Sequence, residues 1–241
     1  MQPKVIALML TTGKRPTITE RAIRSFESQL YENKMLMSYC GNAGFTIGEL
    51  RNSAIRATNG DIVAHFDEDD WSHPNRIAEQ VALLQASGAD CVGYREMLLW
   101  RTRIVRDHLI RNGFRPDDPA MMSFAHVDMP GEAWIYTNPE PDFCLGTSLC
   151  YWRRVWESKP FEALGDEWKW QQGLRRRSIT SLIGSYPNDP YRLCGPRMIV
   201  SIHNGSRLDS LQQQSFRRAP AWDAHCRRIM ESETKGIPDD I

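Results

Sequence analysis

The stretch that decides the fold is Gly48–Gly88, GELRNSAIRATNGDIVAHFDEDDWSHPNRIAEQVALLQASG. Apolar residues at helical spacing over Gly48–Thr58 predict a first helix. The short apolar run Asp61–Phe66 predicts a buried strand. Pro74 then opens a second amphipathic helix that is expected to end at the last glycine of the stretch. An acidic turn therefore lies between a buried strand and a helix.

This turn contains Asp67, Glu68, Asp69 and Asp70 in succession. Four neighbouring carboxylates repel one another, and this repulsion raises their pKa values. A hard divalent cation with oxygen ligands removes the repulsion, so the turn indicates a site for Mn²⁺ or Mg²⁺. The alternative is a solvated acidic turn without a ligand. For Asp70 a second alternative is an acid that stabilises the start of the following helix.

Strands and helices are also expected to alternate in the part of the chain before this stretch. Val5–Thr11 is expected to be a buried strand, and Lys34–Tyr39 a second one. Between them, Thr17 and Glu20 form a predicted capping box at the start of a helix. Strands that alternate with helices predict an α/β fold with a mainly parallel mixed sheet flanked by helices. Ligands of such sheets bind beyond the carboxyl ends of the strands, where Thr11, Thr12, Cys40 and Asp67 are expected.

The second part of the chain has a weaker pattern. Strands are predicted over Cys91–Tyr94, Leu98–Val105, Glu132–Thr137, Phe143–Tyr151 and Ile199–Ile202, and a helix over Gly165–Leu174. We expect one domain over residues 1–230, with a first half over about 1–95 and a second over about 96–230. Residues 231–241 are expected to be a disordered tail.

The composition excludes several classes of protein. The formal net charge of the 241 residues is zero, so no overall field attracts nucleic acid or membrane. The six cysteines are scattered without a C-x-x-C pair, which favours reduced thiols over disulfides or zinc. No apolar run approaches the roughly 20 residues of a membrane span. We therefore expect a soluble, cytoplasmic protein, and the sequence does not indicate its oligomeric state.

The stretch RN-x-AI-x-x-A-x-GD-x-x-AHFDEDDW-x-x-P-x-RI resembles the core of glycosyltransferase family 2, enzymes of the GT-A fold that use nucleotide sugars. Further matches, LTTGKRPTITERAIRSFESQ, GEAWIY, GTSLCYWRRVW and IVSIHNGSR, follow in the family's order. Together they cover most of residues 4–208. The resemblance implies a single GT-A domain and transfer of a sugar, with inversion, from a nucleoside-diphosphate sugar to a hydroxyl. A UDP-sugar is the favoured donor.

The same resemblance suggests which residues bind metal and which acts as base. Asp67 and Asp69 match the D-x-D metal motif, and His203 matches a late histidine that reaches the metal or is structural. The family's base is the aspartate of a G-E-D motif, whereas this chain has Gly165-Asp166-Glu167 with the acids exchanged. By register Glu167 takes the position of the base, with Asp166 as the alternative. Both acids could instead stabilise a helix N-terminus.

The residues expected at the donor come from several segments of the resemblance. They are Thr11, Arg15, Cys40, Arg51, Asp67, Gly146 and Thr147. Cys40 stands where relatives place an aspartate that binds uracil, and Arg51 could instead be a surface ion-pair partner. The small residues Gly146 and Thr147 match a segment that lines the sugar pocket or, alternatively, allow close backbone packing. Trp71 and Trp134 could stack on a ligand or belong to the core.

Other functions are compatible with parts of the sequence. TTGKRP after the first strand weakly fits a nucleotidyltransferase, and the exchanged acids fit a nucleotide- or glycan-binding module without catalysis. The acceptor of a glycosyltransferase is expected to be a saccharide or small hydroxyl compound. The alternative acceptor is DNA with hydroxymethylated bases, as in phages, bound by an arginine-rich surface. The arginines concerned are Arg153, Arg154, Arg175, Arg176, Arg177, Arg192, Arg197, Arg207, Arg217 and Arg218.

Overall fold

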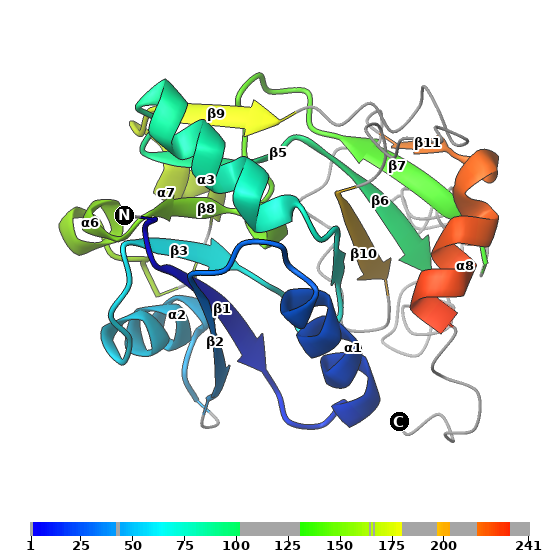
Figure 1. Cartoon of the computed structure of the whole chain (residues 1–241), viewed down its shortest axis with the longest axis horizontal. Helices are drawn as coiled ribbons and strands as arrows, with labels where there is room; N and C mark the ends of the chain where they lie inside the picture. The colour runs from blue at the N-terminus through cyan, green and yellow to red at the C-terminus, as the bar shows by residue number, and fades with distance from the viewer. Residues whose placement is uncertain are drawn as a thin grey trace. The chain divides into compact units, whose positions relative to one another are not determined.

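The computed structural model describes residues 2–41, 44–101, 131–163, 165, 167–179, 197–202 and 216–231 (Figure 1). Its contacts divide the chain into two compact units. The first unit contains Met1–Arg95 and Glu140–Thr180, and the second contains Glu96–Pro139 and Ser181–Ile241. The chain leaves the first unit near the predicted boundary of its halves, but residues 140–180 return to it. That both units form one domain stays a prediction.

The first unit is built on a six-stranded sheet with the order β2-β1-β3-β8-β5-β9. The strands are β1 Val5–Thr11, β2 Lys34–Cys40, β3 Ile62–His65, β5 Cys91–Tyr94, β8 Cys150–Trp152 and β9 Arg176–Ile179. Strands β2 and β3 pair with β1 in parallel, and β9 pairs with β5 in parallel. Strand β8 is antiparallel to both of its neighbours. The predicted mixed, mainly parallel α/β fold is therefore confirmed for this unit.

Both faces of this sheet are covered, as the continuous burial of β1 requires. Val5, Ala7 and Met9 pack on one side with residues of α1, Pro16–Glu27, and α3, Arg76–Ser87. Leu8 packs on the other side with residues of α2, Ile47–Arg56, and of two short helices described below. Figure 1 shows these helices along the sheet. Because side chains alternate between the two faces of a strand, β1 contributes residues to two separate hydrophobic clusters.

The helix starts differ in part from the predictions. The predicted capping box at Thr17 and Glu20 is wrong, because α1 begins at Pro16 and has no side-chain cap. The capping box lies instead at the start of α2, where Thr46 and Glu49 bond each other's backbone N–H groups. Helix α3 begins at Arg76, after the short strand β4, Trp71–Ser72. Gly88 follows its last residue and caps it in the left-handed conformation, as expected of a glycine directly after a helix.

The segment 143–179 is more broken than predicted. The strand predicted over Phe143–Tyr151 is wrong, because Gly146–Ser148 forms a 3₁₀ turn, η2, before β8. Helix α6, Arg153–Ser158, follows this strand. The helix predicted over Gly165–Leu174 is confined to α7, Glu167–Gln171. The polar groups of η2 are held by side chains from other elements, which a local pattern cannot show.

In the second unit β11, β7, β6 and β10 lie side by side in this order. Their bounds are β6 Glu96–Arg101, β7 Ala133–Thr137, β10 Met198–Ile202 and β11 Phe216–Arg218. Pairing is antiparallel except for β10 with β6. The 3₁₀ turn η4, Pro220–Trp222, leads into α8, Asp223–Glu231, a helix that the sequence analysis did not predict. Within the described ranges, no helix has the length and apolar character needed to cross a membrane.

Candidate active site

The predicted carboxyl-end edge of the first unit's sheet is present. Strand β1 ends at Thr11 and its register partner Cys40 ends β2, while β3 ends two residues before Asp67. The amide of Phe66 donates to the carbonyl of Leu8 at 2.9 Å and thus extends the pairing up to the turn. The acidic turn Asp67–Asp70 therefore starts at a fixed point beside the loop that follows β1.

The four acids of the turn do not point the same way. Glu68 and Asp70 are buried, with 3% and 4% of their surface exposed, whereas Asp67 and Asp69 are only partly buried. Asp70 lies six residues before the start of α3, so the reading of Asp70 as a helix N-terminal acid is wrong. The uniform cluster of carboxylates expected from the sequence is thus two pairs with different surroundings.

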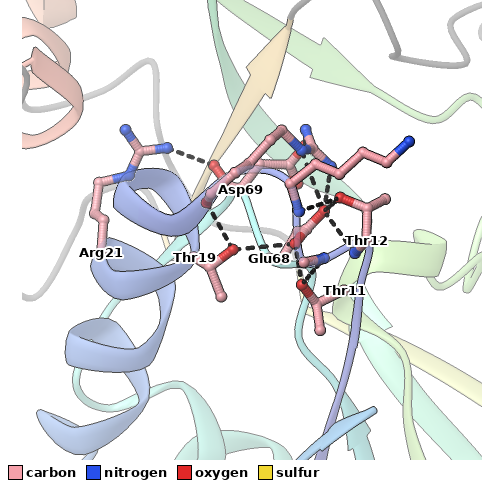
Figure 2. Close-up of polar contacts among 9 residues, drawn as sticks. Thr11, Thr12, Thr19, Arg21, Glu68 and Asp69 are labelled. Carbon is pink, nitrogen blue, oxygen red and sulfur yellow. Dashed lines mark hydrogen bonds and ion pairs between the residues drawn. The ribbon is translucent and has the colours of Figure 1, made fainter. Parts of the chain in front are cut away.

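Glu68 is the structural centre of the turn (Figure 2). Its carboxylate accepts hydrogen bonds from the hydroxyls of Thr11, Thr12 and Thr19 at 2.5, 3.3 and 3.0 Å. Arg15 adds two more, from Nε at 3.1 Å and from Nη2 at 2.5 Å. Burial alone would raise the pKa of Glu68, but the hydrogen bonds and the charge of Arg15 lower it overall. Glu68 therefore ties the turn to the loop after β1 and to the first turn of α1.

Asp69 shares the guanidinium that holds Glu68. Nη1 of Arg15 lies 2.9 Å from Oδ2 of Asp69. From α1, Nη2 of Arg21 donates to the backbone carbonyl of Asp69 at 2.6 Å, as Figure 2 shows. The backbone of Asp69 is thus fixed by one arginine and its carboxylate is compensated by another.

Asp67 has the opposite electrostatic environment to Glu68. Its pKa is raised to about 6, first by burial and then by the carboxylates of Asp69 and Glu167. The charges of Arg51 and Arg76 act in the other direction without cancelling the effect. These charges interact with one another and so form one electrostatic group of four residues predicted from the sequence: Asp67, Asp69, Glu167 and Arg51.

A fully buried arginine lies behind Asp67. Arg76, the first residue of α3, donates from Nη2 to the carbonyl oxygens of His65 and Thr147 and from Nη1 to the hydroxyl of Ser72. Its guanidinium stacks 4.2 Å from the ring centroid of Phe66. Arg76 therefore joins the end of β3 to the turn η2 and supplies a positive charge under the acidic turn.

The carbonyl groups of η2 all point to buried donors. His65 Nδ1 lies 3.1 Å from the oxygen of Gly146 and must donate to it, since a carbonyl only accepts. Burial, and then the charge of Arg51, lower the pKa of His65 well below 6.5, so the ring is neutral. Gln80 donates to the oxygen of Ser148 at 2.6 Å. With Arg76 on Thr147, three consecutive carbonyls are fixed, which explains why these small residues form a turn and not a strand.

Glu167 sits in a narrow place between α2 and η2. Its Oε1 forms an ion pair with Nη2 of Arg51. A Cβ atom added at Gly146 would lie 2.9 Å from Cδ of Glu167, so a larger residue at position 146 would displace this carboxylate. Although Glu167 is the first residue of α7, as the helix-start alternative requires, its side chain is directed to Arg51. The alternative for Arg51 is a surface ion pair. Arg51 does form an ion pair, but it is not at the surface, because only 8% of it is exposed.

Three residues of helix α2 donate hydrogen bonds to the backbone of the segment before Glu167. Nη1 of Arg51 donates to the carbonyl of Gly165 at 2.8 Å, and Nδ2 of Asn52 donates to that of Phe161 at 2.8 Å. The amide of Gly48 donates to the carbonyl of Ala163 at 3.1 Å. The backbones touch here, because a Cβ atom at Gly48 would lie 1.7 Å from the oxygen of Glu162. The position of Glu167 is therefore set by α2.

The residues present fit a divalent cation as a carboxylate pair. Within the described ranges, no group of three or more His, Cys, Asp or Glu side chains is arranged to hold a metal. Asp67 and Asp69 nevertheless face each other closely enough to raise the pKa of Asp67. Such a pair, completed by water and substrate phosphate, is how Mg²⁺ is often held. The predicted ligand His203 and the alternative base Asp166 lie outside the described residues.

The remaining predicted donor residues lie along the same edge. Cys40 is exposed, and a Cβ atom at Gly13 would be in ordinary contact with its sulfur at 3.6 Å. The Thr11 hydroxyl is engaged with Glu68, while Thr147 contributes its carbonyl to the contact with Arg76. Trp71 is partly exposed and packs edge-on against His73, with 6.0 Å between ring centroids. The assignment of these residues to donor binding stays a prediction.

Sequence reasoning missed the roles of Glu68, His65, Arg76 and Gln80. Glu68 and His65 lie within the quoted motif, but their inward direction depends on partners elsewhere in the chain. A signal did exist for Arg76 and Gln80. They are polar residues four positions apart on the inward face of α3, next to Ile77 and Val81, and such positions normally hold apolar residues.

Residues 38–97, about a quarter of the chain, match the family model described as Glycosyl transferase family 2. The match includes α2, β3, the acidic turn and α3, and thus Arg51, Asp67, Asp69 and Arg76. This segment is similar to glycosyltransferase family 2, so the resemblance predicted from the sequence is confirmed over these residues.

Two solved structures with partial similarity also carry glycosyltransferase substrates. A mannosyltransferase from Pyrobaculum calidifontis, in complex with GDP-mannose and Mn²⁺, has 16% identity and a TM-score of 0.46 over 75% of this chain and 55% of that chain. S. aureus TarS, residues 1–349 with UDP-GlcNAc, has 13% identity and a TM-score of 0.49 over 87% and 61%. The chain thus spans less than two thirds of either structure. Among curated proteins no sequence matches.

Proposed function

We propose that this protein transfers a glycosyl group from a nucleoside-diphosphate sugar to a hydroxyl acceptor, with inversion at the anomeric carbon. The observation that carries the proposal is that the charges of Asp69, Arg51 and Glu167 all act on Asp67, and that Asp67, Asp69 and Arg51 lie in the segment that matches the family 2 model. It combines a carboxylate pair suited to a cation with a third carboxylate held separately by an arginine. A transferase needs these two functions at one place.

Asp67 and Asp69 would hold Mn²⁺ or Mg²⁺, which would neutralise the charge of the departing diphosphate when bound. Their mutual repulsion supports this role, because Arg15 and Arg51 offset it only in part, the pKa of Asp67 stays raised, and a cation would remove it. Thr11, Arg15 and Cys40 lie at the same edge and would face the nucleotide. A UDP-sugar is the favoured donor. Position 40 holds a cysteine and not the aspartate that binds uracil in relatives, so the nucleobase of the donor is to be tested with a panel of nucleotide sugars.

Glu167 would act as the general base. Its carboxylate accepts the proton of the acceptor hydroxyl while that oxygen bonds to the anomeric carbon. The bond from the anomeric carbon to the diphosphate oxygen breaks, and its electron pair leaves with the diphosphate. Since Arg51 pairs with Oε1, we assign the proton to Oε2. The ion pair with Arg51 orients the carboxylate, and Gly146 leaves the space that it occupies; general-base catalysis requires such positioning.

For the acceptor, a saccharide or small hydroxyl compound is favoured over modified DNA. Six of the arginines considered for phosphate contacts are already compensated by carboxylates. The pairs are Arg153–Glu157, Arg175–Asp90, Arg176–Glu140, Arg177–Asp142, Arg217–Glu96 and Arg218–Asp223. A carboxylate in such a pair occupies some of the arginine's donors and repels a phosphate, so it weakens phosphate binding at that arginine. The DNA alternative requires transfer to hydroxymethyl-pyrimidine DNA that weakens steeply with salt.

The test is release of nucleoside diphosphate and transfer of sugar from a panel of UDP- and GDP-sugars with Mn²⁺. Glu167→Gln should lower turnover by about a hundred- to ten-thousand-fold. Glu162→Gln is the matched control, since Glu162 lies on the same segment in an exposed pair with Lys169. Equal activities of these two variants, or a product with retained configuration, would contradict the assignment of the base.

The same assay separates the other functions. Pyrophosphate as product would show a nucleotidyltransferase. Binding of donor and metal without turnover, under any acceptor, would show a binding module. Release of nucleoside diphosphate that requires Asp69, tested with Asp69→Asn, supports the transferase.

A further inference from the structure

Arg15 has an unusual position relative to the proposed metal ligands. Its Nε and Nη2 are bound to Oε1 of Glu68, while Nη1 points to Oδ2 of Asp69 at 2.9 Å. One guanidinium therefore spans a carboxylate that is not a proposed metal ligand and one that is. Its planar fork suits this double contact, which a lysine could not make.

The two ends of this contact are unequal. The side chain of Glu68 is 4% exposed and receives three threonine hydroxyls in addition to Arg15. The side chain of Asp69 is 16% exposed, and its charge raises the pKa of Asp67. The contact with Glu68 is thus an anchor, and the contact with Asp69 is the one that can be exchanged at small cost.

We infer that Arg15 is a built-in counter-ion of Asp69, which a divalent cation displaces from that carboxylate while Glu68 retains the guanidinium. This inference rests on the proposed metal site at Asp67 and Asp69. Arg15 is then a positioning residue: it keeps the turn compensated before metal arrives and stays beside the cation afterwards.

A consequence for the order of binding follows from the charges. A divalent cation and a guanidinium that share one carboxylate repel each other at short range. A diphosphate removes this repulsion, because its negative charge can be shared by both. Metal alone should therefore bind weakly, and metal and nucleoside diphosphate should strengthen each other's binding by the same factor.

The test uses Mn²⁺ binding to the whole, metal-free chain, measured by titration calorimetry with and without UDP. Arg15→Gln should tighten binding of Mn²⁺ alone by about tenfold, equivalent to about 1.4 kcal/mol. In the same variant, the gain in Mn²⁺ affinity on addition of UDP should shrink. Loss of a merely structural arginine would instead weaken Mn²⁺ binding, so the sign of the change is diagnostic.

Arg24→Gln is the matched control, because Arg24 is on α1, the helix that follows Arg15, in an exposed pair with Glu20 at 2.6 Å. It removes the same charge and should leave both affinities unchanged. Arg15→Lys keeps the charge without the fork and should give an intermediate result. Circular dichroism and thermal unfolding show whether each variant is folded before it is titrated.

The outcomes separate this inference from the proposed function. If the wild-type chain binds no Mn²⁺ with UDP present, the proposed metal site fails. If wild type binds Mn²⁺ but Arg15→Gln binds it equally or more weakly, the counter-ion role alone is overturned. If Arg24→Gln tightens Mn²⁺ binding as much as Arg15→Gln, the effect is one of net charge, and the inference is also overturned.

Discussion

Glu68 and Asp67 are neighbours in one turn, yet their surroundings have opposite effects. Glu68 is buried among donors and its pKa is lowered, whereas the pKa of Asp67 is raised to about 6 by burial and by two other carboxylates. The first carboxylate stabilises the fold, and the second is kept at a cost in stability. This difference shows that a run of acids is not one feature, and that substitutions along it should separate folding from activity.

Asp67→Asn should have the largest effect of these substitutions, a loss of activity without a loss of stability. Loss of a ligand to a Lewis-acidic cation removes several kcal/mol of transition-state stabilisation, so turnover should fall about a thousandfold. The variant should be at least as stable as wild type, because the substitution removes a carboxylate that Asp69 and Glu167 repel. Turnover and thermal unfolding measured side by side check both claims. Asp90→Asn, in an exposed pair with Arg175, is the control.

Glu68→Gln should have its main effect on stability. The glutamine side chain has nearly the same shape but lacks the negative charge to which Arg15 and three threonine hydroxyls donate hydrogen bonds. Hydrogen bonds to charged groups contribute about 1.5–3 kcal/mol, so we expect a loss of roughly 2–3 kcal/mol in urea unfolding. Glu20→Gln, in an exposed pair on α1, should cost far less. A Glu68→Gln protein as stable as wild type would show that the network is not a structural centre.

The pH dependence of stability should separate the two carboxylates. In the metal-free protein the raised pKa of Asp67 means that the folded state binds more protons than the unfolded state between about pH 4 and 6. The contribution of Asp67 to stability therefore falls as pH rises through this window, by an amount on the order of 3 kcal/mol. Wild type and Asp67→Asn, unfolded with urea at several pH values in chelator, should diverge over this window and then run in parallel. The contribution of Glu68, whose pKa is lowered, has the opposite sign and is lost as pH falls below about 4.5.

Thr19→Val should have the smallest effect. The hydroxyl of Thr19 lies 3.0 Å from Glu68 and 2.8 Å from the carbonyl of Arg15, and its one hydrogen is shared between these acceptors. Its removal leaves Glu68 with its other donors, so the loss should be about 1 kcal/mol. Thr17→Val on the same helix is the control. A loss in Thr19→Val as large as that of Glu68→Gln would mean that the network depends on a single hydroxyl.

The sequence was sufficient for the parts of this architecture that local patterns determine. The strand before the acidic turn and the helices around it follow from apolar periodicity, and the segment that matches the family model includes Asp67 and Asp69. The different directions of Asp67 and Glu68 were not predictable, because they depend on threonines more than 45 positions away. The turn at Gly146–Ser148 was mistaken for a strand for a similar reason, since its carbonyl partners lie on β3 and α3.

For the site itself, the residue types were predicted better than their roles. Arg51 and Glu167 were both selected, but as a nucleotide contact and a base without a link between them. The structure joins them in an ion pair. No periodicity relates two residues so far apart, and the exchanged acids of Gly165-Asp166-Glu167 gave no indication that Arg51 would accept the longer side chain.

The contact of α2 with the segment before Glu167 also has a consequence for how the protein is made. Arg51 and Gly165 are 114 residues apart, so this contact closes a very long loop and can form only after the intervening chain has been synthesised. The acidic turn, by contrast, joins elements within the first 70 residues or so, and its partners leave the ribosome together. We therefore expect that a nascent or truncated chain can form the contacts of the acidic turn while it lacks the proposed base. Catalytic competence is expected to arrive last, as a late event of folding.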